Sequence, residues 1–175
     1  ILSRKISRKN RVIISKDTRL SGYLFEPLIT SGFVSMGMEV VLVGPLPTPA
    51  LPMLIKSLRA DMGVMITGSH NTYEYNGLKF FDSRGNKISK DLEYKIEKII
   101  SNKSTYKKIS YLDHNSGKAL RLESAQGRYL EYLKSTLNKD NTIKKFKIVL
   151  DCGNGATYNV APTLFWELGC NVISI

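Results

Sequence analysis

The chain has 175 residues, of which 42% are hydrophobic and 23% charged, a composition that is ordinary for a globular protein. No stretch is apolar over the length that a membrane span requires, and the first residues lack the pattern of a secretory signal. We therefore expect no membrane partner. The chain starts at Ile1 rather than Met and stops in an apolar run at Ile175, so we expect both ends to be cut from a longer protein.

The formal net charge is +11, from 26 Lys and Arg against 15 Asp and Glu. A basic surface is typical of nucleic-acid-binding proteins, because it attracts phosphate backbones. Here the basic residues are spread over 4–16, 84–108 and 134–147 without regular aromatic residues between them. This pattern favours solvated lysines and small anionic substrates, so no nucleic-acid partner is expected. Cys152 and Cys170 match neither a metal pair nor a disulfide framework, which predicts core thiols in a reducing cytoplasm.

Strand and helix signals alternate along the first part of the chain. We predict a strand at 11–15, a helix at 21–36 ended by Gly37, a strand at 39–43, a helix ending near Leu58 and a strand at 62–67. Thr48 suits the N-cap of the second helix and Pro49 its first helical position. This order predicts a mostly parallel sheet with helices on its faces.

The rest of the chain begins with a strand at 78–82 and a helix at 92–100 that Ser89 caps. The polar segment 101–118 is expected to be a loop with at most a short strand. Later elements are a helix at 126–137, a strand at 147–151, a helix at 161–168 and a strand at 171–175. The last three elements repeat the order of the first three, which indicates a weak internal repeat.

These elements predict an α/β protein. Residues 1–125 are expected to form a three-layer α/β/α domain with a mostly parallel mixed sheet. Residues 126–175 are expected to be the incomplete beginning of a second domain of similar architecture.

The loop at 67–77 follows an apolar strand and carries Ser69 and His70 side by side, with Lys79 just beyond it. Ligands of parallel sheets bind beyond the carboxyl ends of the strands. Ser69 offers a hydroxyl that can carry a phosphoryl group, while His70 and Lys79 can move protons or stabilise negative charge. The competing interpretation is ordinary turn chemistry, because Ser and Asn often bond to nearby backbone and a lysine at a strand end is often solvated.

Two other loops lie at expected strand ends, 16–22 and 44–48. In the first, Asp17 and Arg19 are expected to form a local salt bridge that braces the loop rather than to contact substrate. The run 153–155, Gly-Asn-Gly, follows a strand but lacks the spacing of a nucleotide-binding motif.

Five segments together are similar to the α-D-phosphohexomutase superfamily. They are Asp-Thr-Arg-Leu-Ser-Gly (17–22), Gly-Pro-Leu-Pro-Thr-Pro-Ala (44–50), Thr-Gly-Ser-His-Asn (67–71), Tyr-Asn-Gly-Leu-Lys-Phe-Phe (75–81) and Asp-Cys-Gly-Asn-Gly-Ala-Thr-Tyr (151–158). Their order and spacing match from about residue 11 onward. The wording of the second, fourth and fifth segments is most similar to the bacterial phosphoglucosamine mutases, with phosphomannomutases and phosphoglucomutases as the alternative.

The resemblance implies that Ser69 carries a phosphate and donates it to glucosamine 6-phosphate through a sugar 1,6-bisphosphate. It implies Mg²⁺ on an oxygen of the phosphoserine, with three Asp ligands from a later motif outside this chain. Lys79 matches a lysine placed near the transferring group for acid–base catalysis. His70 matches the histidine beside the phosphoserine, which orients it or transfers a proton.

The chain departs from the family pattern at two positions. Thr72 stands where the family usually has Pro, and Gly68 where the phosphoglucosamine mutases often have Ala. By the resemblance, these residues lack the first strand of the family's domain I with its Arg-containing loop, and also the metal motif, the sugar-recognition loop and the phosphate-binding fourth domain. We therefore predict that the isolated chain is inactive. From other classes, a basic nucleic-acid-binding module and a non-catalytic α/β remnant remain as alternatives.

Overall fold

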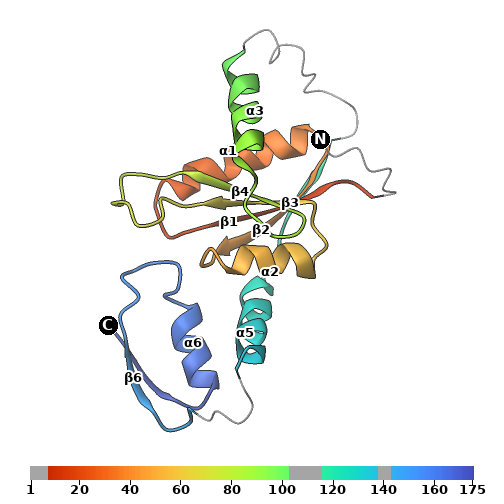
Figure 1. Ribbon diagram of the computed structural model, residues 1–175. Helices are drawn as coiled ribbons and strands as arrows, with labels where there is room; N and C mark the ends of the chain where they lie inside the picture. Colours follow the sequence, from red (N-terminus) through yellow and green to blue (C-terminus); the bar gives the residue numbers. More distant parts are fainter. Residues whose placement is uncertain (1–7, 103–115, 138–142) are drawn as a thin grey trace.

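The computed structural model describes residues 8–102, 116–137 and 143–175 (Figure 1). Its first elements are β1 (Arg11–Lys16), α1 (Gly22–Ser35), β2 (Glu39–Pro45), α2 (Ala50–Ser57), β3 (Met62–Ile66), β4 (Leu78–Asp82) and α3 (Lys90–Ser101). They are followed by β5 (Lys118–Arg121), α5 (Ala125–Ser135), β6 (Lys147–Leu150), α6 (Val160–Glu167) and β7 (Asn171–Ser174). Most of the predicted loop at 101–118 lies outside the described residues.

Five strands form the main sheet in the order β4-β3-β1-β2-β5. β1 pairs in parallel with both β2 and β3, β2 pairs in parallel with β5, and β4 runs antiparallel to β3. The prediction of a mostly parallel mixed sheet is confirmed. The edge strand β5 was not predicted, because four residues that are all exposed carry no hydrophobic period.

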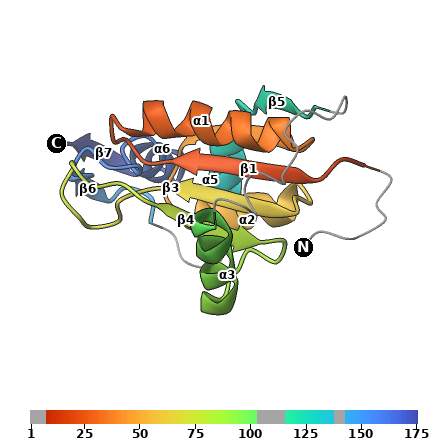
Figure 2. The ribbon, with the colours of Figure 1, turned by 90° about the horizontal axis from the view of Figure 1, so that it is seen from above.

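Helices cover both faces of this sheet, as the three-layer prediction requires. The side chains of Val12, Ile14 and Val64 face α1 and pack with partly buried residues of that helix. The alternate side chains, such as Ile13 and Val41, face α2. Figure 2 shows β1 and β3 between α1 and α2. Strands buried on both faces are apolar without alternation, which is why residues 12–14 read as a continuous apolar run.

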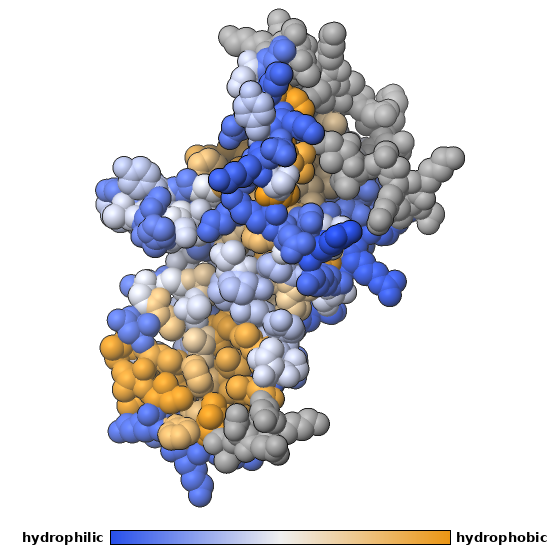
Figure 3. All heavy atoms as spheres, in the orientation of Figure 1, coloured by the Kyte–Doolittle hydropathy of each residue, from blue (hydrophilic) through white to orange (hydrophobic). Residues whose placement is uncertain are grey.

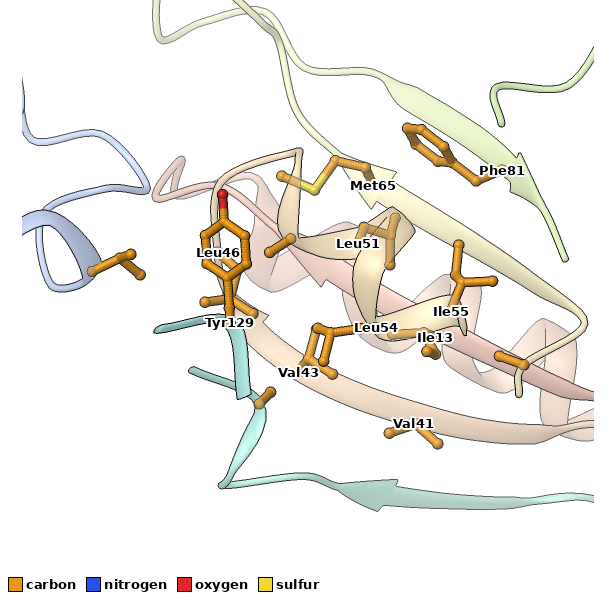
Figure 4. Close-up of a cluster of buried hydrophobic side chains, with 14 of the residues drawn as sticks. Ile13, Val41, Val43, Leu46, Leu51, Leu54, Ile55, Met65, Phe81 and Tyr129 are labelled. Carbon is orange, nitrogen blue, oxygen red and sulfur yellow. The ribbon is translucent and has the colours of Figure 1, made fainter. Parts of the chain in front are cut away.

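The core on the α2 face is built from α2 and the strands that it covers. Leu51, Leu54 and Ile55 of α2 are fully buried against Ile13 and Met65 (Figure 4). This cluster includes Met65, which lies near the carboxyl end of β3. It therefore fixes the position of the strand from which the loop with Ser69 departs.

Helix α5 belongs to the same packing layer. Its residues Ala125, Tyr129 and Leu130 are buried in the α2-face cluster. Figure 4 labels Tyr129 in this cluster. Burial raises the pKa of the Tyr129 phenol, and the neighbouring Tyr132 raises it further. The helix also touches α6, through an ion pair of 2.7 Å between Lys134 and Glu167. A domain boundary at residue 125 stays a prediction, because α5 contacts the elements on both sides of it.

The unit β6–α6–β7 repeats the local geometry of β1–α1–β2. Gly37 and Gly169 follow their helices with φ of 79° and 86°, in the left-handed region that favours glycine. Each donates its N–H to the carbonyl three residues back, and the next residue donates to the carbonyl five residues back. The predicted helix stops and the internal repeat are therefore present in the backbone.

β6 and β7 pair in parallel as a two-stranded sheet. Their side of the molecule carries exposed apolar residues, among them Phe146, Val149 and Trp166. Figure 3 shows an apolar surface over this unit. Cys170 is buried here and Cys152 half-buried, and both are free thiols.

Two predicted helix starts were tested by the structure. Ser89 caps α3 as predicted, because its hydroxyl accepts a hydrogen bond of 3.3 Å from the N–H of Leu92. The predicted cap of α2 is wrong by one position. Pro49 occupies the N-cap, and Leu51 donates to the carbonyl of Thr48 rather than to its hydroxyl.

Candidate active site

The loops that follow β1, β2 and β3 meet at one edge of the sheet, at the left of Figure 1. Together with the loop after β6 they enclose a cavity of about 890 Å³. The lining residues come from four separate segments: Asp17 to Leu20, Pro47 and Thr48, Met65 to Tyr73 in part, and Gly153 to Thr157. The prediction that the loop at 67–77 lies at a ligand-binding edge therefore agrees with the geometry of the sheet.

Ser69 is exposed and lines this cavity. Its φ of 57° lies in the left-handed region, which is uncommon for a residue with a Cβ. Hydrogen bonds hold the peptide groups on both sides of this residue. The N–H of Ser69 donates to Thr67 Oγ1 at 3.0 Å, and its carbonyl accepts from Arg19 Nη2 at 3.1 Å.

Arg19 reaches from the first loop into the Ser69 loop. Besides Ser69, its guanidinium donates to the carbonyls of Asn71 at 2.7 Å, of Tyr75 at 2.6 Å and of Thr72. The predicted salt bridge with Asp17 is present, with 2.9 Å between Nε and Oδ2. The prediction of a local brace was thus right but incomplete, because Arg19 also organises the loop that carries Ser69.

Asp17 joins the two loops through its carboxylate. Oδ2 accepts from Arg19 Nε and from the hydroxyl of Thr67 at 2.8 Å, and Oδ1 accepts from the backbone N–H of Arg19 at 3.1 Å. The backbone N–H of Asp17 also donates to the carbonyl of Ile66 at 3.0 Å. The bonds to Thr67 and Ile66 fix the start of the Ser69 loop relative to β1.

The two positions that depart from the family pattern both touch Arg19. Thr72 uses its backbone carbonyl for this contact, and proline also has a carbonyl, so the departure keeps the acceptor. Gly68 lies directly under the guanidinium. A Cβ there would be 2.5 Å from Arg19 Cζ and 2.5 Å from the carbonyl oxygen of Tyr75, so alanine would require the guanidinium to move.

His70 is exposed and lines the cavity beside Ser69. Lys79 is half-buried in β4, directly opposite Met65 of β3. Opposite residues of an antiparallel pair point to the same face of a sheet, and Met65 itself lines the cavity. Lys79 therefore lies on the α2 face of the sheet, and it is not one of the residues that line the cavity.

The loop at 153–157 closes the cavity from the second unit. Thr18 links it to the first loop, because its hydroxyl donates to the carbonyl of Asn154 at 2.7 Å. Sequence reasoning did not foresee this contact, or the reach of Arg19. The hydroxyl of Thr18 and the guanidinium of Arg19 both donate to backbone carbonyls. Every residue type has this acceptor, so the sequence cannot indicate which residues accept these bonds.

Lys16, next to Asp17, forms an ion pair with Glu26 of α1 under the same edge. The two side chains are 7% and 8% exposed, with 2.7 Å between Nζ and Oε2. The ammonium also lies 4.3 Å from the centre of the Tyr23 ring. Within the described part of the chain, Glu26 Oε1 has no hydrogen-bond partner.

The described residues contain no group of three His, Cys, Asp or Glu side chains that could hold a metal ion. Asp17 is the carboxylate at the cavity, and its oxygens are occupied by Arg19 and Thr67. The implied Mg²⁺ therefore finds no coordination shell among these residues. In the same described ranges, no helix is both long and apolar enough to span a bilayer.

A family model for phosphoglucomutase/phosphomannomutase, alpha/beta/alpha domain I, matches residues 1–107, which is more than half of the chain. The chain belongs to this phosphohexomutase family. The matched residues include the strands and helices of the α/β/α layers up to α3 and four of the five segments, those at 17–22, 44–50, 67–71 and 75–81.

Relatives of this phosphohexomutase chain include phosphoglucosamine mutases. The one from Granulibacter bethesdensis is 53% identical over 167 residues, which cover 95% of this chain and 36% of the relative. The one from Paramagnetospirillum magneticum is 54% identical over 164 residues, covering 94% and 36%. The crystal structure of a phosphoglucomutase/phosphomannomutase family protein from Burkholderia thailandensis matches with a TM-score of 0.78 at 28% identity, covering 95% of this chain and 35% of that chain. The chain thus spans little more than a third of the length of these proteins.

Proposed function

We propose that this chain supplies the phosphoryl-carrying part of a phosphoglucosamine mutase. Ser69 Oγ carries the phosphate, gives it to glucosamine 6-phosphate to form the 1,6-bisphosphate, and takes a phosphate back as glucosamine 1-phosphate leaves. The observation that carries the proposal is an exposed serine, held in a left-handed conformation beside His70 in a cavity at the carboxyl edge of the sheet. The names of the relatives support the sugar.

The three proposed site residues have separate tasks. Ser69 is the nucleophile and the phosphate carrier. Lys79, near the start of β4, stabilises charge on the transferring group or acts in acid–base catalysis. His70 orients the phosphate or transfers a proton. Phosphoryl transfer needs little covalent chemistry from the protein beyond placement and positive charge, which is what such a set offers.

Among the groups of this chain, Mg²⁺ would bind only an oxygen of the phosphate on Ser69. When bound it would neutralise charge on the phosphoryl group. Its carboxylate ligands would come from outside the described residues, since these contain no suitable cluster. The proposed partners are a phosphosugar and its 1,6-bisphosphate.

The closest alternative is a phosphomannomutase or phosphoglucomutase. The family description and the Burkholderia thailandensis structure both name these activities. Measuring kcat/KM for glucosamine 6-phosphate, mannose 6-phosphate and glucose 6-phosphate therefore identifies the preferred substrate.

The test uses the protein from the longest reading frame that contains this chain. After incubation with glucosamine 1,6-bisphosphate, peptide mass spectrometry should find one phosphate on the peptide around Ser69. Ser69→Ala should carry none and should lose turnover, while Ser83→Ala, in a turn after β4, should keep both. A wild-type protein without phosphate on Ser69, or an active Ser69→Ala variant, would overturn the proposal. The 175-residue chain alone should show no turnover.

A further inference from the structure

The backbone of Ser69 is held in a conformation that a serine does not prefer. Its φ of 57° lies in the left-handed region, which is strained for a residue with a Cβ. Such a conformation persists only when surrounding contacts impose it. Two hydrogen-bonded arms do so here, and both start from the carboxylate of Asp17.

The first arm passes through Thr67. Asp17 Oδ2 accepts from the Thr67 hydroxyl at 2.8 Å, and the same hydroxyl oxygen accepts from the N–H of Ser69 at 3.0 Å. The second arm passes through Arg19, which donates from Nε to Asp17 and from Nη2 to the carbonyl of Ser69. The N–H and the C=O that flank φ and ψ of Ser69 are thus both tied to one carboxylate.

Arg19 has no donor left for a ligand. A guanidinium has five N–H groups, and in Arg19 these donate to the Asp17 carboxylate and to four loop carbonyls. An arginine that binds phosphate needs two parallel donors free for the phosphate oxygens. This arginine can therefore bind a phosphate only by giving up the loop.

We propose that Asp17, Arg19 and Thr67 form a positioning clamp that sets the direction of Ser69 Oγ for phosphoryl transfer. This inference rests on the proposed function. In the transfer, the bond between Oγ and phosphorus breaks as the sugar hydroxyl oxygen bonds to phosphorus; the sugar hydroxyl gives its proton to a base, and Oγ takes up a proton as it leaves. The donor and acceptor oxygens must lie in line, and a misplacement of about 1 Å lowers the rate about 100-fold.

The clamp predicts a kinetic signature that differs from loss of substrate binding. The clamp residues hold backbone groups and present no free donor to substrate, so weakening them should lower kcat and leave KM nearly unchanged. Thr67→Val keeps the shape of the side chain and removes the hydroxyl on which the first arm depends. Thr67→Ser keeps the hydroxyl and is the matched control.

In the protein from the longest reading frame, Thr67→Val should lower kcat about 10- to 100-fold, and Thr67→Ser should stay within about 3-fold of wild type. Arg19→Lys should resemble Thr67→Val, because one ammonium with three donors cannot serve five acceptors. In Thr67→Val and in Arg19→Lys, amide hydrogen exchange should be faster than in wild type in the loop around Ser69, and unchanged in β1 and β3. This local readout separates positioning from general unfolding.

The outcomes are distinct for the two proposals. If wild type carries no phosphate on Ser69, the proposed function fails, while the exchange measurement still tests the clamp. If wild type is active and Thr67→Val keeps its kcat, or if exchange in the loop does not rise, the clamp is refuted. Equal losses for Thr67→Ser and Thr67→Val would refute it as well.

Discussion

Gly63 of β3 faces α2 at a point where the core has no room for a further methyl group. A Cβ built on Gly63 would lie 2.6 Å from Ile55 Cδ1, 3.1 Å from Ile55 Cγ1 and 3.1 Å from Leu51 Cδ1. Contacts of this kind force side chains off their rotamers, and overpacking typically costs about 1–3 kcal/mol. Gly63→Ala should therefore destabilise the fold, although alanine normally suits a strand better than glycine.

The closest obstacle can be removed by a second substitution. Ile55→Val deletes the Cδ1 methyl and should cost about 0.5–1.5 kcal/mol by itself. In the double variant the new Cβ occupies the space of that methyl, and only the two contacts of 3.1 Å remain tight. The double variant should therefore be about 1 kcal/mol more stable than the sum of the single losses, which is a coupling typical of residues in contact.

Urea unfolding of the four proteins, followed by circular dichroism, measures this coupling from the free energies of unfolding. The control replaces Gly32 in α1, where a Cβ would meet no atom within 4 Å. Gly32→Ala should stabilise by about 0.5–1 kcal/mol and add to Ile55→Val without coupling. Additive losses for Gly63→Ala and Ile55→Val, within about 0.5 kcal/mol, would refute the packing argument.

Three further predictions concern a buried ion pair, a buried phenol and an exposed glycine. Lys16→Met should lower the free energy of unfolding by about 3–5 kcal/mol, because it leaves Glu26 buried without a counter-charge. The double variant Lys16→Met with Glu26→Leu should be nearly as stable as wild type. A double variant as unstable in urea as the single one would contradict this. The raised pKa of Tyr129 means that the unfolded state loses this proton first, near the usual 10.0, so stability should fall as the pH rises beyond that value. Tyr129→Phe should show a shallower fall in the same urea series, and parallel curves would speak against it. Gly127→Ala on the exposed face of α5 should raise the free energy of unfolding by about 0.5–1 kcal/mol, and a loss would show that the glycine has a contact.

The order of the elements could be predicted from the sequence because each strand and helix of the sheet has its own hydrophobic signal. Residues 12–14 are apolar without alternation, and glycines with positive φ follow the helices at positions 37 and 169. β5 could not be predicted, because pairing with β2 alone makes Lys118–Arg121 a strand. Propensity placed the cap of α2 on Thr48, whereas the turn that enters the helix places Pro49 there.

The location of the candidate site was also predictable, since strand ends and polar loops are visible in the sequence. Its internal organisation was not. The loop is held by Arg19 through carbonyls of residues fifty and more positions away, and a carbonyl is the same in every residue. Lys79 was predicted as a site residue and stays a prediction, and its face of the sheet follows only from the register with Met65.

The antiparallel pairing of β3 and β4 has a consequence for how this site tolerates changes of chain length in evolution. A parallel neighbour of β3 would begin at the far edge of the sheet, about 17 Å from the cavity, whereas the hairpin returns Lys79 to the edge that Ser69 occupies. Ser69 and Lys79 therefore lie on one short, contiguous segment of the chain. Insertions or deletions in the helical crossovers elsewhere can lengthen or shorten the domain without altering the spacing between Ser69 and Lys79.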